Sequence, residues 1–102
     1  MITHVGVIGA GKVGQGIIQA MAQAGINVVF KEMSDALIKD AISSISGSLD
    51  RRIRRWAITP SEKAATLARI KGVTNYEPLL KAEIIIESVW KWMRKHPNGY
   101  AK

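Results

Sequence analysis

An apolar, β-branched run that leads directly into a glycine-rich loop most restricts what this chain can fold into. Residues 5–8 read Val-Gly-Val-Ile, and Gly9, Gly11 and Gly14 follow with the spacing Gly-x-Gly-x-x-Gly. In a strand–turn–helix unit the first glycine makes the tight turn, the second lets the backbone approach a pyrophosphate, and the third lets helix and strand pack closely. The N-terminus of the helix would face the phosphates with free N–H groups and a positive dipole. The pattern predicts a dinucleotide site.

A helix and a second strand follow the glycine loop and complete a strand–helix–strand unit. Residues 13–24 carry apolar side chains at helical spacing, and Gly25 supplies the helix stop. The residues expected on the buried face of this helix are Val13, Ile17, Ala20, Met21 and Ala24. Residues 26–30 are predicted to form the second strand, parallel to the first through a right-handed crossover.

An acidic residue, Glu32, ends the second strand at the distance from the glycine loop that a dinucleotide site requires. Its carboxylate could accept hydrogen bonds from an adenosine ribose, which would favour NAD over NADP because a 2′-phosphate would meet like charge. The alternative is a solvated carboxylate at a strand end, and the adjacent Lys31 weakens the discrimination. Lys12 lies in the loop, where such a side chain more often points to solvent than to a pyrophosphate.

A long helical hairpin is predicted after the second strand. Ser34 or Asp35 can cap a helix that runs to about Ala57. The apolar side chains of this helix recur three and four apart and should face a partner helix; they are Ile38, Ile42, Ile45, Leu49, Ile53 and Trp56. Residues 59–62, Thr-Pro-Ser-Glu, match a capping box with proline at the first helical position and start a second helix to about Ile70.

Two further strands complete the predicted sheet. Residues 73–75 are predicted to form a short third strand, 78–81 a helical turn, and 82–87 a fourth strand centred on three isoleucines. The expected fold class is α/β, a partial Rossmann fold with about four parallel strands in the order 3-2-1-4 and the helical hairpin inserted after the second strand. The expected division is a half-domain at 1–89 and a basic C-terminal tail at 90–102.

The composition of the 102 residues fits one folded domain and excludes several function classes. The hydrophobic share of 47% argues against disorder, and the absence of cysteine excludes disulfides, thiol catalysis and cysteine-based metal sites. His4 and His96 have no nearby ligand-type partner, so no metal site is predicted. No apolar run approaches the roughly 20 residues of a membrane span. The N-terminus has no signal-peptide pattern, so no membrane association and a cytoplasmic location are expected.

Several segments together resemble a known family. They are the Val-Ile-Gly-Ala-Gly loop at 7–11, the helix Gly-Ile-Ile-Gln-Ala-Met-Ala-Gln-Ala-Gly at 16–25, the acidic end of the second strand, the hairpin with Ser48-Leu49, and Ala-Glu-Ile-Ile-Ile-Glu-Ser at 82–88. Over about residues 3–89 the chain resembles the N-terminal, NAD-binding part of the 3-hydroxyacyl-CoA dehydrogenase family, which includes the 3-hydroxybutyryl-CoA dehydrogenases. The paired-helix insertion discriminates better than the glycine loop, which many nucleotide-binding families share.

The resemblance implies NAD as cofactor and an acyl-CoA substrate, whose 3-hydroxyl is oxidised by hydride transfer. The cofactor site that it implies consists of Gly9, Gly11, Lys12, Val13, Gly14, Glu32 and Ser88. A family serine and a basic residue seven positions later, which hold the CoA nucleotide, fall on Ser48 and Arg55. The catalytic histidine and glutamate of the family lie later in the chain, so no catalytic residue is predicted here. We expect a domain that binds NAD and is catalytically incomplete alone.

The resemblance fades just after the fourth strand. Family members carry a glutamate and, five residues on, a lysine near the cofactor, whereas this chain has Lys91 and His96 at the aligned positions. This departure affects the nicotinamide end of the site. It suggests a truncated copy, a diverged copy, or a sequence that ends near a domain boundary.

Four arginines, Arg51, Arg52, Arg54 and Arg55, lie within five residues of the long helix and contribute to the net charge of +7. The simplest interpretation is a solvated outer face, and binding of the CoA nucleotide is the sharper one. Nucleic-acid binding is disfavoured because no aromatic platform or recognised motif accompanies the arginines. The runner-up function is therefore a non-catalytic interaction module that binds an anionic partner through this helix. A fragment without independent function is the third alternative.

The fourth strand would lose one neighbour if the sheet ended there. An uncovered apolar edge invites pairing with another chain. We therefore expect a homo-oligomer, or a complementing chain at the edge formed by residues 83–87.

Overall fold

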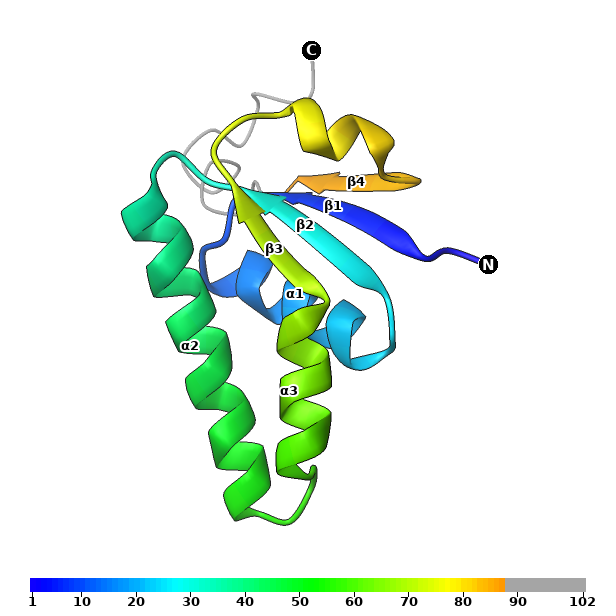
Figure 1. Ribbon diagram of the computed structural model, residues 1–102. Coiled ribbons are helices and arrows are strands. Elements are labelled where there is room, and N and C mark those ends of the chain that lie inside the picture. Colours follow the sequence, from blue (N-terminus) through cyan, green and yellow to red (C-terminus); the bar gives the residue numbers. More distant parts are fainter. Residues whose placement is uncertain (88–102) are drawn as a thin grey trace, which may run out of the picture.

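The computed structural model describes residues 1–87. Four parallel strands form its sheet, as predicted (Figure 1). The elements in chain order are β1 (His4–Ile8), α1 (Lys12–Gln23), β2 (Asn27–Lys31), α2 (Asp35–Arg54), α3 (Pro60–Ala68), β3 (Ile70–Val73), the 3₁₀ helix η1 (Glu77–Lys81) and β4 (Ile84–Glu87). The strand order is β3-β2-β1-β4, and all three strand pairs are parallel. This confirms the predicted partial Rossmann sheet.

The helices divide between the two faces of the sheet. Figure 1 shows α1, α2 and α3 on one face and the short η1 on the other. The hairpin of α2 and α3 extends well beyond the sheet, with its connecting turn at the far end. Among the described elements, no helix has the length and apolar character needed to cross a membrane.

The core lies between the sheet and the three helices. Val7 of β1 pairs with Phe30 of β2 on one side and with Ile86 of β4 on the other. Because paired residues of neighbouring strands point to the same face of a sheet, these three side chains lie on one face. Phe30 is fully buried, and it joins a cluster that includes Ile18 of α1 and Leu49 of α2. The first half of the chain therefore builds one continuous core.

The third strand lies earlier in the chain than its predicted position. A strand is predicted at 73–75, directly after Gly72, but β3 spans Ile70–Val73 and contains that glycine. A Cβ at Gly72 would lie 2.8 Å from Cζ of Phe30 and would overlap Ile38 of α2. Gly72 is thus a strand residue that lets α2 approach the sheet, and this role leaves no periodic signal in the sequence.

The buried face of α1 also differs from the expectation. The buried residues are Gly14, Ile18, Gln19 and Ala22, whereas Val13 is 45% exposed and Ala20 and Ala24 are exposed. Gly14 explains the difference, because the side of a helix that carries a glycine can approach a sheet most closely. The stripe facing the sheet therefore runs through Gly14 at intervals of four residues, with Ile17 and Met21 on its flank.

Side-chain caps fix both helices of the hairpin. Ser34, one of the two predicted caps, accepts a hydrogen bond from the backbone N–H of Leu37 at 3.3 Å. The predicted capping box of α3 is confirmed, since Thr59 Oγ1 accepts from the Glu62 N–H at 3.1 Å and the Glu62 carboxylate accepts from the Thr59 N–H. Helix α2 ends at Arg54, and Trp56, predicted to pack inward, is 94% exposed.

Glu83 fastens the start of β4 to the start of β1. Its Oε1 accepts hydrogen bonds from the Thr3 N–H at 2.9 Å, from the Thr3 hydroxyl at 2.9 Å and from the His4 N–H at 3.2 Å. These bonds, the Thr3 backbone bond foremost, hold the pKa of Glu83 below its ordinary value of 4.5. A lowered pKa adds stability that is fully present above the unfolded-state pKa and is lost as the pH falls through the folded-state pKa.

Substitution of Glu83 should therefore alter the acid limb of the stability curve. We expect Glu83→Gln to lose less unfolding free energy than the parent chain between about pH 6 and pH 3, measured by urea denaturation. Asp40→Asn on the exposed side of α2 is the control and should keep the parent slope. Equal slopes in parent and Glu83→Gln would contradict this role for Glu83.

Candidate functional site

The glycine loop leaves β1 at the carboxyl edge of the sheet and enters α1 directly. Gly9 has φ +90°, a conformation that glycine adopts without the strain of a side chain, and its N–H donates to the carbonyl of Lys31 at 3.0 Å. Gly11 follows as the N-cap of α1 with an extended backbone, φ −71° and ψ −170°. The loop thus turns the chain sharply at the point where β1 and β2 end side by side.

The first turn of α1 offers unoccupied hydrogen-bond donors. Its N-cap, Gly11, has no side chain to accept from these N–H groups, and the turn carries no acidic residue. An added Cβ at Gly11 would meet no atom within 4 Å, so the space in front of the turn is open. Free N–H groups and the positive end of the helix dipole together make an anion-binding position.

Glu32 lies against this loop, as its spacing in the sequence predicts. Its Oε2 accepts from the Ala10 N–H at 2.6 Å, and its Oε1 accepts from the Met33 N–H at 3.1 Å. A carboxylate has about four acceptor positions. Both oxygens of this half-buried group therefore keep capacity to accept hydroxyl groups from a ligand.

The two lysines near the loop have different surroundings. The Lys31 ammonium lies 4.5 Å from the ring centroid of Tyr76 and 3.6 Å from the sulfur of Met33. Lys12 is exposed and lines a hollow between α1 and α2. Lys31 is therefore occupied by an aromatic contact, whereas Lys12 faces open space beside the loop.

The hollow between α1 and α2 is polar and has a volume of about 220 Å³. Its lining consists of Lys12, Gln15, Gly16, Gln19, Ser44, Ile45, Ser48 and Arg51. Ser48 thus lines this hollow together with Lys12 and Arg51. Arg55 caps the C-terminus of α2 and does not line the hollow. Helical spacing could have identified Ser44 and Arg51, which lie one turn from Ser48.

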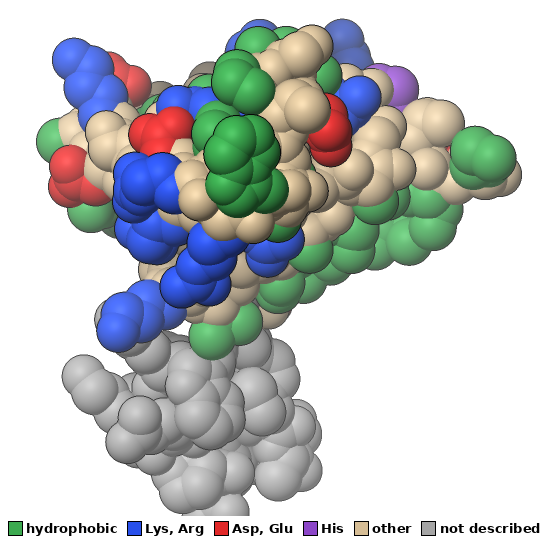
Figure 2. Space-filling view, turned by 90° about the horizontal axis from the view of Figure 1, so that it is seen from below, with side chains coloured by type: hydrophobic (Ala, Val, Ile, Leu, Met, Phe, Trp, Pro, Cys, Tyr) green, Lys and Arg blue, Asp and Glu red, His purple; other side chains and the backbone are tan. Residues whose placement is uncertain are grey.

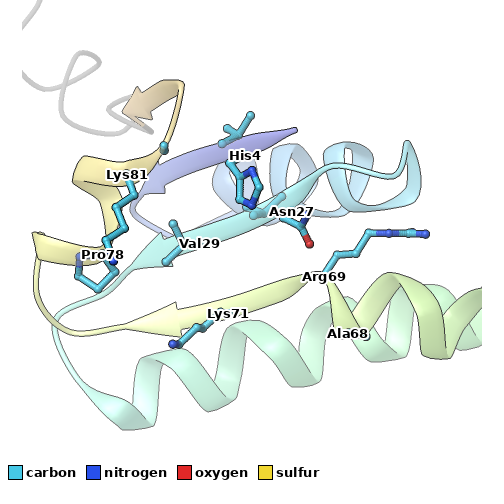
Figure 3. A pocket seen from close by; sticks show the side chains of 11 residues that line it. His4, Asn27, Val29, Ala68, Arg69, Lys71, Pro78 and Lys81 are labelled. Atoms are coloured by element: carbon cyan, nitrogen blue, oxygen red, sulfur yellow. The ribbon is translucent and has the colours of Figure 1, made fainter. Parts of the chain in front are cut away.

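A second hollow, of about 270 Å³, lies at the opposite end of the sheet (Figure 3). It is bordered by His4 and Asn27, the first residues of β1 and β2. Arg69 at its rim is already used, because its Nη1 donates to the Ala22 carbonyl at the end of α1 at 2.9 Å. Ligands of open parallel sheets bind at the carboxyl ends of the strands, so this hollow is not part of the dinucleotide site.

Several sequence-predicted positions fall outside the described residues. They are Ser88, Lys91, His96 and the proposed boundary at residue 89. Within residues 1–87, no group of three or more His, Asp or Glu side chains could hold a metal ion.

Comparison with known proteins gives one consistent set of matches. The family model of the 3-hydroxyacyl-CoA dehydrogenase NAD-binding domain matches residues 4–97. A 3-hydroxybutyryl-CoA dehydrogenase of Bradyrhizobium diazoefficiens is 34% identical over 88 residues, which are 86% of this chain and 30% of that protein. The chain thus spans about a third or less of the length of the curated relatives it matches.

Solved structures agree with this match. The crystal structure of (S)-3-hydroxybutyryl-CoA dehydrogenase from Ralstonia eutropha is similar with a TM-score of 0.84 and 44% identity, over 86% of this chain and 31% of that one. The 3-hydroxybutyryl-CoA dehydrogenase from Escherichia coli has a TM-score of 0.82 and 32% identity, over 85% of this chain and 18% of that one.

Substitution of the first two loop glycines should have opposite effects on stability. Gly9→Ala places a side chain at positive φ, and we expect it to lower the free energy of unfolding by about 1–2 kcal/mol. Gly11→Ser supplies the missing N-cap acceptor in a compatible backbone and should raise it by about 0.5–1 kcal/mol. Urea denaturation followed by circular dichroism measures both changes. A destabilised Gly11→Ser would contradict the open N-cap described above.

Proposed function

The chain belongs to the family of 3-hydroxyacyl-CoA dehydrogenase NAD-binding domains, and on this premise we propose that its glycine loop and Glu32 hold NAD(H) for hydride exchange with an acyl-CoA. NAD is the cofactor of this family. The observation that carries the proposal is the 2.6 Å hydrogen bond between Glu32 and the loop, beside the uncapped first turn of α1. These features bring a ribose acceptor and a pyrophosphate donor set to one edge of the sheet.

Each loop position has a proposed role. The pyrophosphate would lie over Gly11 and accept from the N–H groups at the start of α1, among them those of Lys12 and Val13. Gly14 keeps α1 close to the sheet, so that these donors stay near the loop. Glu32 would accept from the hydroxyls of the adenosine ribose. Ser88 follows β4 in sequence and is proposed to contact the cofactor.

An acyl-CoA is the proposed substrate. Ser48 lines the polar hollow with Lys12 and Arg51, and Arg55 lies seven residues after Ser48 on α2. Serine hydroxyls and arginine guanidinium groups are suited to phosphate oxygens, and Arg binds them with two parallel hydrogen bonds. We propose that α2 holds the phosphorylated nucleotide end of CoA through Ser48, Arg55 and, as the structure adds, Arg51.

Calorimetric titration of the 102-residue chain tests the cofactor proposal. We expect saturable NADH binding that exceeds NADPH binding by about tenfold or more, because juxtaposed like charges cost several kcal/mol. Glu32→Ser should reduce this preference, and Asp40→Ser is the matched control. Gly11→Ser should weaken NADH binding by about 5- to 150-fold, since overpacking costs about 1–3 kcal/mol, while the fold is kept. No binding of either dinucleotide would overturn the proposal.

The same preparation separates binding from catalysis. The family resemblance assigns the catalytic histidine and glutamate to later sequence, and His4 lies at the end of β1 remote from the loop. Residues 1–102 alone are therefore expected to bind NADH without acetoacetyl-CoA-dependent oxidation of it. Turnover that survives rigorous removal of host enzymes would show that the chain supplies its own catalytic groups.

The edge of β4 is the proposed contact for a partner chain. Within the described sheet β4 pairs only with β1, and Ile84 and Ile85 are 41% and 47% exposed. We expect light scattering to show a concentration-dependent dimer or higher oligomer of the 102-residue chain. Ile85→Lys should shift the equilibrium toward monomer, whereas Lys71→Arg, in β3 at the opposite edge of the sheet, should not. A monomer at all concentrations would favour a separate complementing chain.

A further inference from the structure

The hollow at the amino ends of the strands (Figure 3) is a fixed feature of the fold. It lies beside η1, whose Leu79 is buried against Gly6 of β1; a Cβ added at Gly6 would lie 3.2 Å from Cγ of Leu79. The chain that leaves η1 is fixed as well, because the Glu83 N–H donates to the His4 carbonyl at 3.0 Å. Two packed elements, the sheet and η1, therefore form the hollow.

One wall of the hollow is apolar. Val29 alternates along β2 with the buried Val28 and Phe30, so its side chain points to the face of the sheet that η1 covers. Pro78 of η1 and Ala82, which follows η1, border the same space. The side chains of Val29, Pro78 and Ala82 therefore offer contact to the hydrophobic part of a ligand.

The rim of the hollow is cationic. Lys71 of β3 and Lys81 of η1 both line it and are exposed. Within residues 1–87 neither lysine has a side-chain hydrogen bond or an ion pair, and none of the residues given for the lining is acidic. The nearby acid Glu83 already accepts from Thr3 and from the His4 N–H at Oε1. Both ammonium groups are therefore available to an anion.

The other polar groups of the rim favour a carboxylate over a phosphate. Figure 3 shows Arg69 extending away from the two lysines, and its Nη1 donates to the Ala22 carbonyl. The guanidinium fork that binds phosphate with two parallel hydrogen bonds is thus directed elsewhere. Nδ1 of His4 is bonded to Thr3 Oγ1 at 2.9 Å. The Asn27 amide has no hydrogen-bond partner in the described part of the chain, and it can donate to a carboxylate oxygen.

This cationic rim is separate from the positive charge on the hairpin and from the glycine loop. Figure 2 looks along the hairpin and shows Lys and Arg side chains gathered at its tip. The hollow instead lies where β1 begins, and β1, with five residues, is about 16 Å long. The glycine loop lies at the other end of β1. An anion in the hollow would therefore be a ligand additional to the proposed cofactor and substrate.

We propose that this hollow binds a small monocarboxylate with a hydrophobic body, of the aryl or short-chain alkyl class. The carboxylate pairs with Lys81, with Lys71 as the second cation of the rim, and the body covers Val29 and Pro78. The volume of about 270 Å³ lies below the range of about 300–1,000 Å³ of drug-sized sites. At about 30 Å³ for each water-sized group, the hollow holds roughly nine non-hydrogen atoms.

Titration of the isotope-labelled 102-residue chain with sodium benzoate, followed by NMR of the backbone amides, tests the inference. We expect saturable shifts of amides that line the hollow, such as those of Val29, Lys71 and Ala82, with the amides of the glycine loop and of the hairpin tip unmoved. Acetate keeps the charge and lacks the ring, so it should bind at least about tenfold more weakly. Benzyl alcohol keeps the ring and lacks the charge, and it should also bind more weakly than benzoate.

Variants of the rim and of the wall separate the two contributions. Lys81→Met removes the charge and keeps the aliphatic stem, so benzoate should bind about 3- to 10-fold more weakly. Lys39→Met on α2 is the matched control and should keep the parent affinity. Val29→Phe fills the hollow and should abolish the saturable shifts although Lys81 is present. Circular dichroism spectra that match the parent spectrum show that each variant is folded.

Equal benzoate affinity in the parent chain and in Lys81→Met would overturn the inference, as would shifts confined to the glycine loop or to the hairpin tip. Inorganic phosphate that binds the hollow as tightly as benzoate would show a site for an anion alone and would overturn it too. The inference does not rest on the proposed NAD function. NADH titration followed by the same spectra reports on the amides of the glycine loop, so failure of either proposal is recognised separately.

Discussion

The fold depends on the tight connection between the ends of β1 and β2. Gly9 turns the chain at positive φ and donates to the carbonyl of Lys31 at 3.0 Å, and the next N–H, that of Ala10, donates to Glu32 at 2.6 Å. The carbonyl of Ala10 in turn accepts from the Gln15 side chain at 2.8 Å. The loop is therefore held by β2 on one side and by α1 on the other. A loop fixed in this way can present its remaining N–H groups to a ligand without reorganising.

Close packing between helices and sheet extends from this connection. Gly14 lets α1 lie near the sheet, and Gly72 leaves room for Ile38 and Phe30, so that α2 can lie beside β3. At both positions the residue is a glycine, and the absence of a side chain leaves space for the neighbouring element. Because α2 is anchored at its N-terminal half in this manner, its C-terminal half can extend beyond the sheet and carry exposed charge.

The parts of the fold that the sequence predicted are those with local signals. The glycine spacing, the capping box at Thr59 and the three isoleucines of β4 each identify an element from a few adjacent residues. The third strand was misplaced because Gly72 has the same local signature as a helix stop and as a close approach between elements. The exposure of Trp56 could not be predicted, since helical spacing assigns it to the buried stripe and only the actual end of α2 removes it. In the candidate site, Glu32 was found by its spacing, whereas Arg51 required the orientation of α2 against α1.

The start of α1 and the C-terminal end of α2 share one physical feature. At Gly11 the helix begins without a side-chain cap, and at Trp56 it is followed by a bulky residue in the conformation that glycine favours. A serine at the first position and a glycine at the second would each satisfy helix-end preferences better. Ser34, which begins α2, does follow those preferences and lies between the two. The chain thus departs from local stability at two helix ends, one of which, the start of α1, faces the proposed pyrophosphate site. Unused N–H donors at the start of α1 would serve the pyrophosphate of the proposed cofactor. Departures of this kind, which occur beside optimised caps in the same chain, are expected where binding and folding make different demands on a residue.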